Sequence, residues 1–542
     1  MSTSLRFFRR AALGTFTVAA LTAQAQAPLT SAQRWQHLDL KADGVPGISA
    51  DRAYRELLAG RTPTPVLVAV IDSGIDSTHE DLKPILWRNQ REIVGNYQDD
   101  DHNGYVDDVR GWNYLGNKNG RNVADENLEQ TRIYAQLRAQ FDAATVNRKK
   151  LSPADQVKFD LYQQAKASYL KAKTEDEAIY LRVKSLLANA TKAYTQIIST
   201  LQVEALDSAT LHRTALTRAD LPGATDLYFM VNSSHAIGAE AVLKELREGV
   251  DYYKNQVEKS LNPNFNARVV VGDDPANLAQ TDYGNPDSQG PDADHGTHCA
   301  GIIGAVRTNG RGIEGVADAV RIMSVRAVPN GDERDKDIAN AIHYAVDNGA
   351  QIISMSFGKE FSPDKAAVDA AMRYADQHGV LLVHAAGNDN KDVDAGNNNF
   401  PSNRYLDGQP IPNLITVGAS SPLNTAELAA KFSNYGAQGV DLFAPGVDIY
   451  STIPGGGYTM HSGTSMAGPV VAGVAAVLKA YYPQLTAAQL KQCILQSAVP
   501  NHTKVNKPGT KDLVDFATLS HTGGIVNLYA AVQLAAQQVA GK

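Results

Sequence analysis

The sequence predicts an α/β fold in which a mostly parallel β-sheet lies between layers of helices and carries a large helical insertion. First, residues 65–71 form a continuous apolar run rich in β-branched side chains, as in a strand that is buried on both faces. Second, similar runs alternate with helical patterns such as 337–348 and 363–378, which indicates parallel strands joined by helices. Third, residues 122–262 are rich in helix-forming Ala, Gln, Lys, Glu and Leu, and we expect them to form the insertion.

Further apolar runs are expected to be strands of the same sheet. They are residues 321–327, 351–356, 380–385, 414–417 and 441–444. In such sheets ligands bind beyond the carboxyl ends of the strands. Asp72 and Asn388 follow two of the predicted strands, so we expect the functional site at this edge of the sheet.

The length and composition of the chain exclude several classes of protein. With 542 residues, 43% of them hydrophobic and 20% charged, the chain is too long for one small module and is neither collagen-like nor mainly disordered. The formal net charge of -7 gives no overall attraction to nucleic acid or to an anionic membrane. The 2 cysteines are too few for a disulfide framework, and the sequence does not decide whether they form one bridge.

The start of the chain has the pattern of an export signal. Arg6, Arg9 and Arg10 precede the small apolar stretch 11–23, and residues 23–25 (Ala-Gln-Ala) fit the rule for a cleavage site. This stretch is shorter than a comfortable membrane span, and we expect no transmembrane helix elsewhere in the chain. We therefore predict a secreted or periplasmic protein with a signal peptide over residues 1–25. The rest of the chain is predicted to divide into an N-terminal extension 26–61, a first part of the main domain 62–121, a helical insertion 122–262 and a second part of the main domain 263–540.

The insertion is predicted to be a helical hairpin or a small bundle. Ser152 followed by Pro153 marks a helix start, and residues 174–177 fit a capping box. A second helix is expected over 236–261. Apolar residues spaced by three and four form one stripe on the first helix: Ile179, Val183, Leu186, Ala190, Tyr194, Ile197 and Leu201. The stripe fits a hairpin that packs on itself, which we favour, or a coiled coil that contacts a partner protein.

Three short segments combine a reactive side chain with small residues that let another backbone approach closely. The segments are 70–74, 295–301 and 462–469, and they contain Asp72, His295 and Ser465. A serine hydroxyl is a weak nucleophile that needs a base, and an imidazole base needs a carboxylate to orient it. Taken alone, Asp72 could cap a turn and Ser465 could cap a helix. The three together predict a catalytic triad, and their order along the chain differs from that of the α/β-hydrolases.

With four further motifs, these segments make the sequence resemble the subtilisin-like serine peptidases, or subtilases. The further motifs are residues 352–358, 385–388, 432–436 and 441–446. The resemblance covers about residues 62–112 and 285–540 and does not include the insertion. It implies the subtilisin-like three-layer fold, so that the two parts of the main domain would together form a peptidase domain.

The resemblance also implies a role for each site residue. Ser465 would be the nucleophile, His295 the general base and then acid, and Asp72 the carboxylate that orients His295. Asn388 would donate a hydrogen bond to the oxyanion, a role that suits an amide N–H aimed at the developing charge. The residues implied to bind the substrate are Ser354, Ser356, Phe357, Gly358, Ala385, Ala386 and Gly387.

We therefore predict an exported serine endopeptidase that hydrolyses peptide bonds in proteins through an acyl-enzyme intermediate. Phe357 and the small residues 385–387 favour a broad specificity, with apolar or aromatic side chains before the scissile bond. Because the insertion separates Asp72 from His295 in the chain, we expect it to border the active site. The alternatives are a catalytically silent subtilase core that binds partners through the insertion, and an esterase or lipase, which the missing Gly-x-Ser-x-Gly elbow disfavours.

An acidic loop, residues 99–108, predicts a calcium (Ca²⁺) site. Its oxygen-bearing residues alternate as in a calcium-binding loop, and a backbone carbonyl would complete the pattern. Arg110 stands where an EF-hand has its bidentate Glu, so the predicted site is not an EF-hand. The predicted ligands are Asp99, Asp101, Asn103, Tyr105 through its carbonyl, and Asp107, and the alternative is a solvated acidic turn.

His298 and Cys299 follow His295 within about one helical turn. A zinc site would need a fourth ligand at a suitable spacing, which this grouping lacks. We therefore predict that both residues pack in the interior, Cys299 as a small hydrophobic side chain.

Overall fold

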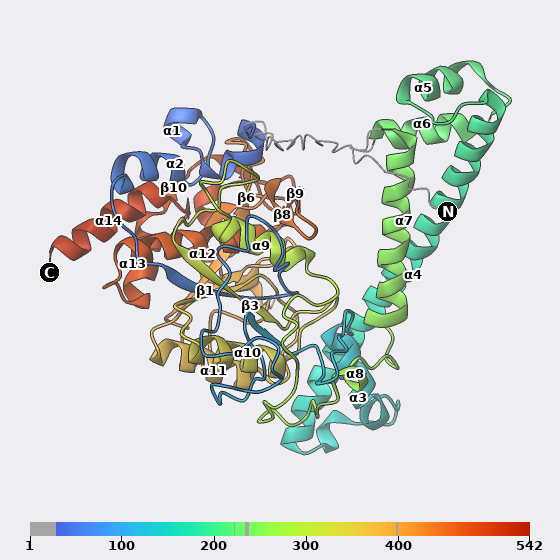
Figure 1. The fold of residues 1–542 in the computed structure, drawn as a ribbon. Helices are drawn as coiled ribbons and strands as arrows, with labels where there is room; N and C mark the ends of the chain where they lie inside the picture. The colour runs from blue at the N-terminus through green and yellow to red at the C-terminus, as the bar shows by residue number, and fades with distance from the viewer. Residues whose placement is uncertain (1–28, 222, 234–237, 397–398, 542) are drawn as a thin grey trace, which may run out of the picture.

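The computed structural model describes residues 29–221, 223–233, 238–396 and 399–541. Figure 1 shows a body in which helices cover both faces of a central sheet, and a long helical arm that projects from one side of it. The predicted signal peptide, residues 1–25, lies outside the described residues.

The central sheet has nine strands and is mostly parallel. The strand order is β10 (Val499–Pro500), β13 (Gly524–Ile525), β7 (Leu442–Pro445), β6 (Leu414–Ser420), β5 (Leu381–Ala385), β4 (Ile352–Met355), β1 (Val66–Asp72), β3 (Val320–Arg326) and β2 (Gly111–Asn113). β10 and β13 at one edge pair antiparallel, and the other neighbours pair parallel. The runs predicted as strands correspond to β1 and to β3 through β7, so the predicted sheet is confirmed.

Side chains of β1 alternate between two hydrophobic cores, one on each face of the sheet. Val66, Val68 and Val70 face the first core, whereas Ala69 and Ile71 face the second. The first face is covered by α9 (Asp294–Gly304), α12 (Thr464–Tyr481), α13 (Ala487–Ser497) and α14 (Leu528–Ala540), and the second by α10 (Asp335–Asp347) and α11 (Lys365–Gln377). This arrangement confirms the three-layer fold and explains the unbroken apolar sequence of the strand.

The helix α12 runs through the first core. Among the described residues it is the one helix long and apolar enough to cross a membrane, yet 89% of that stretch is buried inside the protein. Its apolar sequence therefore reflects its place in the core, where every side of the helix meets other side chains.

The N-terminal extension packs on this same core. It contains the short helices α1 (Leu40–Asp43) and α2 (Ala50–Ala53), and Trp35 and Ile48 are among the buried core residues. Trp35 Nε1 donates to Val447 O at 3.0 Å, and Leu528 N donates to Ile48 O at 2.8 Å. The extension therefore shares the hydrophobic core of the peptidase-like body.

The insertion forms the arm. Its helices are α3 (Glu129–Phe141), α4 (Pro153–Leu201), α5 (Ser208–Thr217), α6 (Gly223–Ser233) and α7 (Ala239–Asn255), and α8 (Arg268–Val271) follows where the chain returns to the body. α4 is 49 residues long and lies beside α7, with α5 and α6 at the end far from the body (Figure 1). Ala190 and Ile197 of the predicted stripe are buried with Leu211 and Leu227 in a separate core near that end. The helices of the arm therefore pack on one another, as favoured from the sequence.

One predicted helix start is wrong. Ser152 begins α4 as expected, because its Oγ accepts a hydrogen bond from Asp155 N at 3.1 Å. The capping box predicted at 174–177 is absent, since α4 continues through these residues. Thr174 Oγ1 instead donates to Leu170 O at 2.8 Å, within the helix. A threonine hydroxyl can bond to the carbonyl four residues before it, so Thr174 is compatible with the middle of a helix.

A buried network of charges attaches the base of the arm to the body. Glu129 of α3 pairs with Arg132, and its carboxylate also accepts from Lys359 Nζ at 2.7 Å. Lys359 Nζ lies 2.9 Å from Asp335 Oδ1 as well. Burial acts to raise the pKa of Glu129, but the positive charges of Arg132 and Lys359 outweigh this effect and lower the pKa to about 2. Removing one partner from such a buried pair typically costs about 3–5 kcal/mol, so the base of the arm is held firmly.

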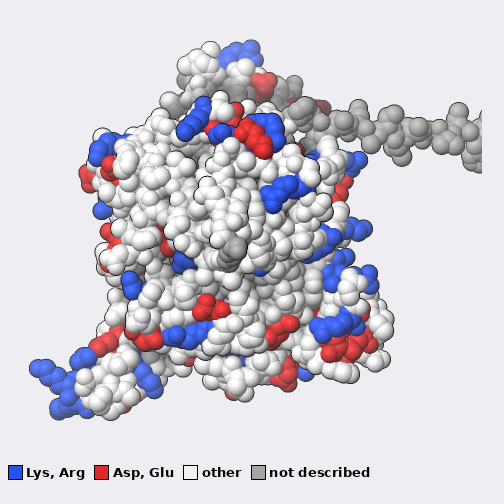
Figure 2. Space-filling model, turned by 90° about the vertical axis from the view of Figure 1, so that its left-hand side faces the viewer, with Lys and Arg blue, Asp and Glu red and all other residues white. Residues whose placement is uncertain are grey.

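Charged side chains of both signs are interspersed on the face of the body that lies away from the arm. Figure 2 shows Lys and Arg next to Asp and Glu around a largely uncharged middle. Mixed charges of this kind create little long-range field. The surface thus agrees with the small net charge of -7 for the whole chain.

Candidate active site

Asp72 and His295 form a hydrogen-bonded pair at the carboxyl end of the sheet. Asp72 is the last residue of β1, and His295 is the second residue of α9. His295 Nδ1 lies 2.7 Å from Asp72 Oδ1, and the Asp72 side chain is 2% exposed while that of His295 is 40% exposed. Burial acts to lower the pKa of His295, but the Asp72 carboxylate raises it, and the resulting pKa is well above its ordinary value.

Gly296 lets α9 approach the strand that ends at Asp72. A Cβ atom at this position would lie 2.2 Å from Gly74 O and 3.1 Å from Asp72 Cβ. A larger residue would therefore push α9 away from β1 and disturb the contact between Asp72 and His295. This close approach explains why glycine follows the histidine.

Ser465 lies in the first turn of α12 and is joined to the predicted substrate-binding segment. Ser465 Oγ donates to Ser356 O at 3.2 Å, and Ser356 Oγ donates to Ser465 O at 2.9 Å. Among the described residues, no hydrogen bond joins Ser465 to His295. Catalytic hydrogen bonds are often long without substrate and shorten when it binds.

Cys299 lies where the segments of His295 and Ser465 meet. Its Sγ is 3.9 Å from His295 Nδ1 and donates to Ser465 O at 3.4 Å. Cys299 and His298 are both fully buried, and Cys299 is a free cysteine, as is Cys493. Burial, together with nearby His461, lowers the pKa of His298 to about 3, so this ring stays neutral. The interior packing predicted for both residues agrees with these positions.

Asn388 is oriented by the residue that precedes Ser465. Its Oδ1 accepts from Thr464 N and from Thr464 Oγ1, each at 2.9 Å. Gly387 N in turn donates to Thr464 Oγ1 at 3.1 Å. Because its oxygen faces Thr464, the amide N–H₂ group of Asn388 is turned away from that residue and can donate elsewhere.

The side chains predicted to bind the substrate are mostly buried. Ser354, Ser356, Phe357, Ala385 and Ala386 are each at most 8% exposed. Gly358 is exposed and Gly387 is half-buried. At the surface, these two segments therefore present mainly the backbone at Gly358 and Gly387.

A pocket of about 550 Å³ lies beside His295. On the body it is lined by Asp72, His295 and the segment 356–358. On the arm it is lined by Tyr252, Asn255, Gln256 and Ser260. The insertion therefore borders the site, as expected from its place in the chain, although nothing in the sequence singled out these four residues.

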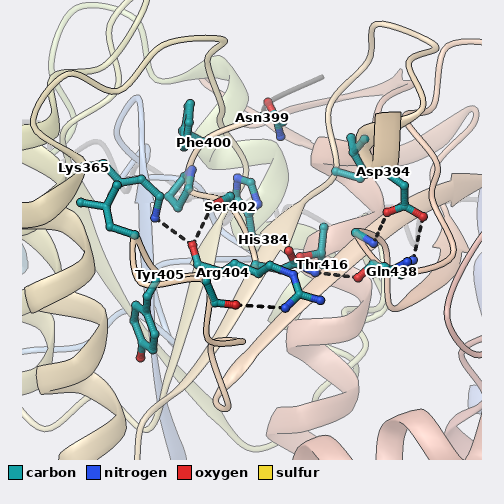
Figure 3. A pocket seen from close by; sticks show the side chains of 17 residues that line it. Lys365, His384, Asp394, Asn399, Phe400, Ser402, Arg404, Tyr405, Thr416 and Gln438 are labelled. Atoms are coloured by element: carbon teal, nitrogen blue, oxygen red, sulfur yellow. Dashed lines mark hydrogen bonds between the residues drawn. The ribbon is translucent and has the colours of Figure 1, made fainter. Parts of the chain in front are cut away.

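A second pocket, of about 470 Å³, is lined by Ala386 and is drawn in Figure 3. Its wall includes Lys365, whose Nζ donates to Arg404 O at 2.9 Å. Asn399 also lines it and donates to Ala385 O at 3.1 Å, with its amide against Gly358 and Gly387. Asn399 could not be predicted as a site residue, because only the folded chain brings its loop against Ala385, Gly358 and Gly387.

The acidic loop brings together only part of the predicted calcium ligands. Carboxylate oxygens of Asp99, Asp101 and Glu92 all lie within 4.8 Å of one another, and Glu92 is not among the predicted ligands. Asp107 faces a neighbouring turn, where it accepts from Gly95 N at 2.8 Å and from Tyr97 N at 2.9 Å. The side chains that meet in the loop are therefore Glu92, Asp99 and Asp101.

The remaining two predicted ligands have other contacts as well. Asn103 Oδ1 accepts from Tyr105 N at 2.8 Å, and Asn103 Nδ2 donates to Asp108 Oδ2 at 3.1 Å. The Tyr105 ring lies between Trp112 and Tyr344, with ring centroids 5.0 and 4.8 Å away. The tyrosine thus anchors the loop to the second core.

Comparisons with known proteins agree with the geometry. A family model described as the subtilase family matches residues 162–523, more than half of the chain, and this range includes His295, Asn388 and Ser465. The chain is 39% identical to the thermophilic serine proteinase of Bacillus sp. (strain AK1) over 231 residues, which are 42% of this chain and 50% of that protein. It is 39% identical to thermitase of Thermoactinomyces vulgaris over 242 residues, which are 44% of this chain and 75% of that protein.

Other relatives match a similar share of the chain. The alkaline elastase YaB of Bacillus sp. (strain YaB) is 37% identical over 240 residues, 44% of this chain and 55% of that protein. A solved structure of proteases from Pseudoalteromonas arctica is 29% identical and covers 44% of this chain and 70% of that one, with a TM-score of 0.37. The chain thus spans about half the length of the first relatives that it matches. The family match, the three-layer fold and the segments around Asp72, His295 and Ser465 lead to one conclusion: this chain belongs to the subtilase family.

Proposed function

We propose that this chain is a serine endopeptidase that hydrolyses peptide bonds in proteins through a Ser-His-Asp triad. The observation that carries the proposal is the 2.7 Å contact between His295 Nδ1 and Asp72 Oδ1 at the edge of the sheet where Ser465 begins a buried helix. The names of the relatives, a serine proteinase and thermitase among them, support the same activity.

In the proposed reaction, Ser465 Oγ attacks the carbonyl carbon of the scissile bond. His295 Nε2 takes the serine proton and then gives it to the leaving amine, which departs and leaves an acyl-enzyme. Water, activated by the same imidazole, then releases the new carboxyl end and restores Ser465. Asp72 keeps the Nδ1–H tautomer of His295 and stabilises the imidazolium that forms in each step.

Asn388 is the proposed oxyanion donor, together with the backbone N–H of Ser465. The contacts of Asn388 Oδ1 to Thr464 support this role, because they leave the Nδ2 hydrogens to donate. The amino terminus of α12 adds the positive end of a helix dipole near the developing charge. Donors held in place in this way stabilise the oxyanion without reorganising.

The proposed substrate is an extended peptide of broad sequence, with an apolar or aromatic residue before the scissile bond. Support comes from the accessible backbone at Gly358 and Gly387 and from the apolar side chains around them. Export to the periplasm or the medium is proposed from the pattern of residues 1–25. A competing function, partner binding by a silent core, is less favoured because the three triad residue types are all present.

Digestion of an unfolded protein tests this function. Enzyme recovered from the periplasm or the culture medium of an expressing bacterium should cleave reduced casein, and fragment masses should place most cleavages after Leu, Met, Phe or Tyr. The pocket assignment is wrong if the cleavages follow only Lys or Arg. The export assignment is wrong if the protein stays in the cytoplasm with its first residues intact.

We further propose that the acidic loop binds Ca²⁺ through Glu92, Asp99 and Asp101, with Asn103 and the Tyr105 carbonyl nearby. Clustered carboxylate oxygens are the ligands that this hard cation prefers. Burial raises the pKa of Glu92, and the charges of Asp101 and Asp100 add to this effect, although hydrogen bonds from their backbone N–H groups act to lower the pKa. Arg91, which lies 2.9 Å from Asp101 Oδ2, supplies part of that charge.

Removal of calcium is expected to lower the melting temperature. At a free Ca²⁺ concentration of about 100 times Kd, binding stabilises the folded state by about 2.7 kcal/mol, which corresponds to a shift of several degrees. Thermal unfolding should therefore occur at lower temperature in EGTA, and Ca²⁺ but not Mg²⁺ should restore it. Asp99→Asn should abolish the response. An unchanged melting temperature in EGTA would contradict the site.

A further inference from the structure

The pocket beside His295 is lined by more acidic than basic side chains. Its carboxylates are Asp72, Asp125, Asp292, Asp294 and Glu333, and its described lining contains neither Lys nor Arg. The carboxylates come from both sides of the pocket and from segments far apart in the chain. Their charges must therefore be balanced by neighbours outside the lining or by a bound group.

Three of these carboxylates already have a nitrogen of another side chain beside them. Asp72 is bonded to His295. Asp125 Oδ2 lies 2.6 Å from Lys259 Nζ, and Asp294 Oδ2 lies 2.8 Å from His461 Nε2. The other two carboxylates in the pocket lining are those of Asp292 and Glu333.

Glu333 is a buried acid without a partner for its carboxylate. The residue is 2% exposed, and in the described structure its side chain accepts no hydrogen bond and forms no ion pair with another residue. The nearby cations bind its backbone instead, since Arg132 and Lys359 donate to Glu333 O at 3.1 and 2.8 Å. Burial raises the pKa of Glu333 to about 8, with a contribution from Asp332, although the positive charge of Lys359 acts to lower it. Burying an acid in this way is unfavourable unless a cation or donor meets it.

Asp292 is exposed and also retains capacity to bind. Its Oδ2 accepts from Asn330 Nδ2 at 3.1 Å. The guanidinium of Arg326, which interacts electrostatically with Asp292, is directed elsewhere, because its nitrogens donate to Ser73 O, Asn113 Oδ1 and Val123 O. An approaching cation would therefore find the Asp292 carboxylate free of a strong ion pair.

We infer that this pocket binds a lysine or arginine side chain of the substrate, from a residue that precedes the scissile bond. The inference rests on the proposed peptidase function. The pocket joins the catalytic His295 to the segment 356–358, along which the acyl side of an extended peptide would lie. The cation would reach Glu333 and Asp292, and the exposed ring of Tyr252 on the arm offers a cation–π contact.

The enzyme would then recognise two positions of the substrate in different ways. The residue directly before the scissile bond would still be apolar or aromatic, as proposed above from the small residues Gly358, Ala385 and Gly387. A basic residue farther from the scissile bond would enter the pocket beside His295. Because Tyr252 and Gln256 line that pocket, the insertion would help to select the substrate.

A matched set of fluorogenic peptides tests the inference. Each peptide keeps Phe before the scissile bond and carries Lys, Leu or Glu in turn at the second, third and fourth positions before that bond. At one of these positions, kcat/KM should be about 10-fold or more higher for Lys than for Leu, as expected for a charge-assisted hydrogen bond. The Glu peptide should be the slowest of the three.

Variants identify the residues responsible. The ratio of kcat/KM for the Lys peptide to that for the Leu peptide, measured within each variant, is the readout: Glu333→Gln should bring this ratio close to one, and Asp292→Asn should lower it part of the way. Asp282→Asn, an exposed aspartate outside the pocket lining, should change neither rate. If Glu333→Gln does not fold, Asp292→Asn alone decides, because its side chain lies at the surface.

Two negative results have different meanings. If the enzyme cleaves the Leu peptides but does not prefer Lys at any of the three positions, the pocket assignment is wrong and the proposed function stands. A preference for Lys over Leu that persists in both variants would also overturn the pocket assignment. If no peptide is cleaved and a fluorophosphonate probe does not label Ser465, the proposed function itself fails.

Discussion

Ser465→Ala is expected to abolish peptide hydrolysis and labelling by a fluorophosphonate. In a serine peptidase the loss of the nucleophile lowers kcat by about a million-fold, and what remains comes from substrate binding and the oxyanion donors. The probe should react with the original enzyme because His295 activates the Ser465 hydroxyl, and a fluorophosphonate forms a covalent bond with an activated serine. Labelling is read by in-gel fluorescence, and hydrolysis by release of peptide fragments.

The fold should tolerate this substitution. Ser465→Ala removes the hydrogen bond from Ser465 Oγ to Ser356 O, which is worth about 1 kcal/mol. Melting temperatures of the two proteins should therefore be close. Ser462→Ala, in the loop before α12, is the control and should keep both label and activity. Persistent labelling of Ser465→Ala would place the reactive serine elsewhere and overturn the proposed nucleophile.

Asp72→Asn is expected to lower kcat by about 10,000-fold, because an asparagine favours the wrong tautomer of His295. Asp72 Oδ1 accepts from His295 Nδ1 and from Ser73 N, each at 2.7 Å. An amide of the same shape fits this buried position but cannot stabilise the imidazolium. The variant should therefore fold and still bind peptide, and steady-state kinetics should show the loss mainly in kcat.

The pH dependence of kcat/KM should also differ between the original enzyme and Asp72→Asn. Since Asp72 raises the pKa of His295, kcat/KM of the original enzyme should fall as the pH decreases through that raised value, where the imidazole becomes protonated. Without the carboxylate, the pKa of His295 should be lower, so the acid limb of the profile should move to lower pH. Asp76→Asn is a control, because this buried carboxylate bonds to Thr78 and Gly455 rather than to His295. An unshifted acid limb in Asp72→Asn would contradict the proposed pair.

Much of the fold could be predicted because its determinants are local. Residues 66–71 are apolar without alternation, as both faces of β1 are covered, and the same pattern identified the other central strands. The insertion was recognisable from its helix-forming composition. The helix start at Thr174 was mispredicted because a capping pattern can also occur inside a helix, where the hydroxyl bonds to Leu170 O.

The residues of the candidate site could also be predicted only where their determinants are local. Asp72, His295 and Ser465 stand in short segments with small neighbours, and that local pattern is specific enough to be recognised in a sequence. Glu92 and Asn399 carry no such pattern. Each reaches its site because a loop folds back on another part of the chain, and neither the loop's path nor its contacts follow from spacing.

The sequence by itself determined the sheet, the helical insertion and the residue types for nucleophilic chemistry, since hydrophobic periodicity and short motifs are properties of neighbouring residues. The tertiary structure alone decided how the arm meets the body. Glu129 of the arm pairs with Lys359 of the body, and Tyr252 lines the pocket that holds Glu333. Such contacts join residues far apart in the chain, and their energies depend on burial and on the charges that packing brings together. For this reason the acidic pocket beside His295 became visible only in the folded protein.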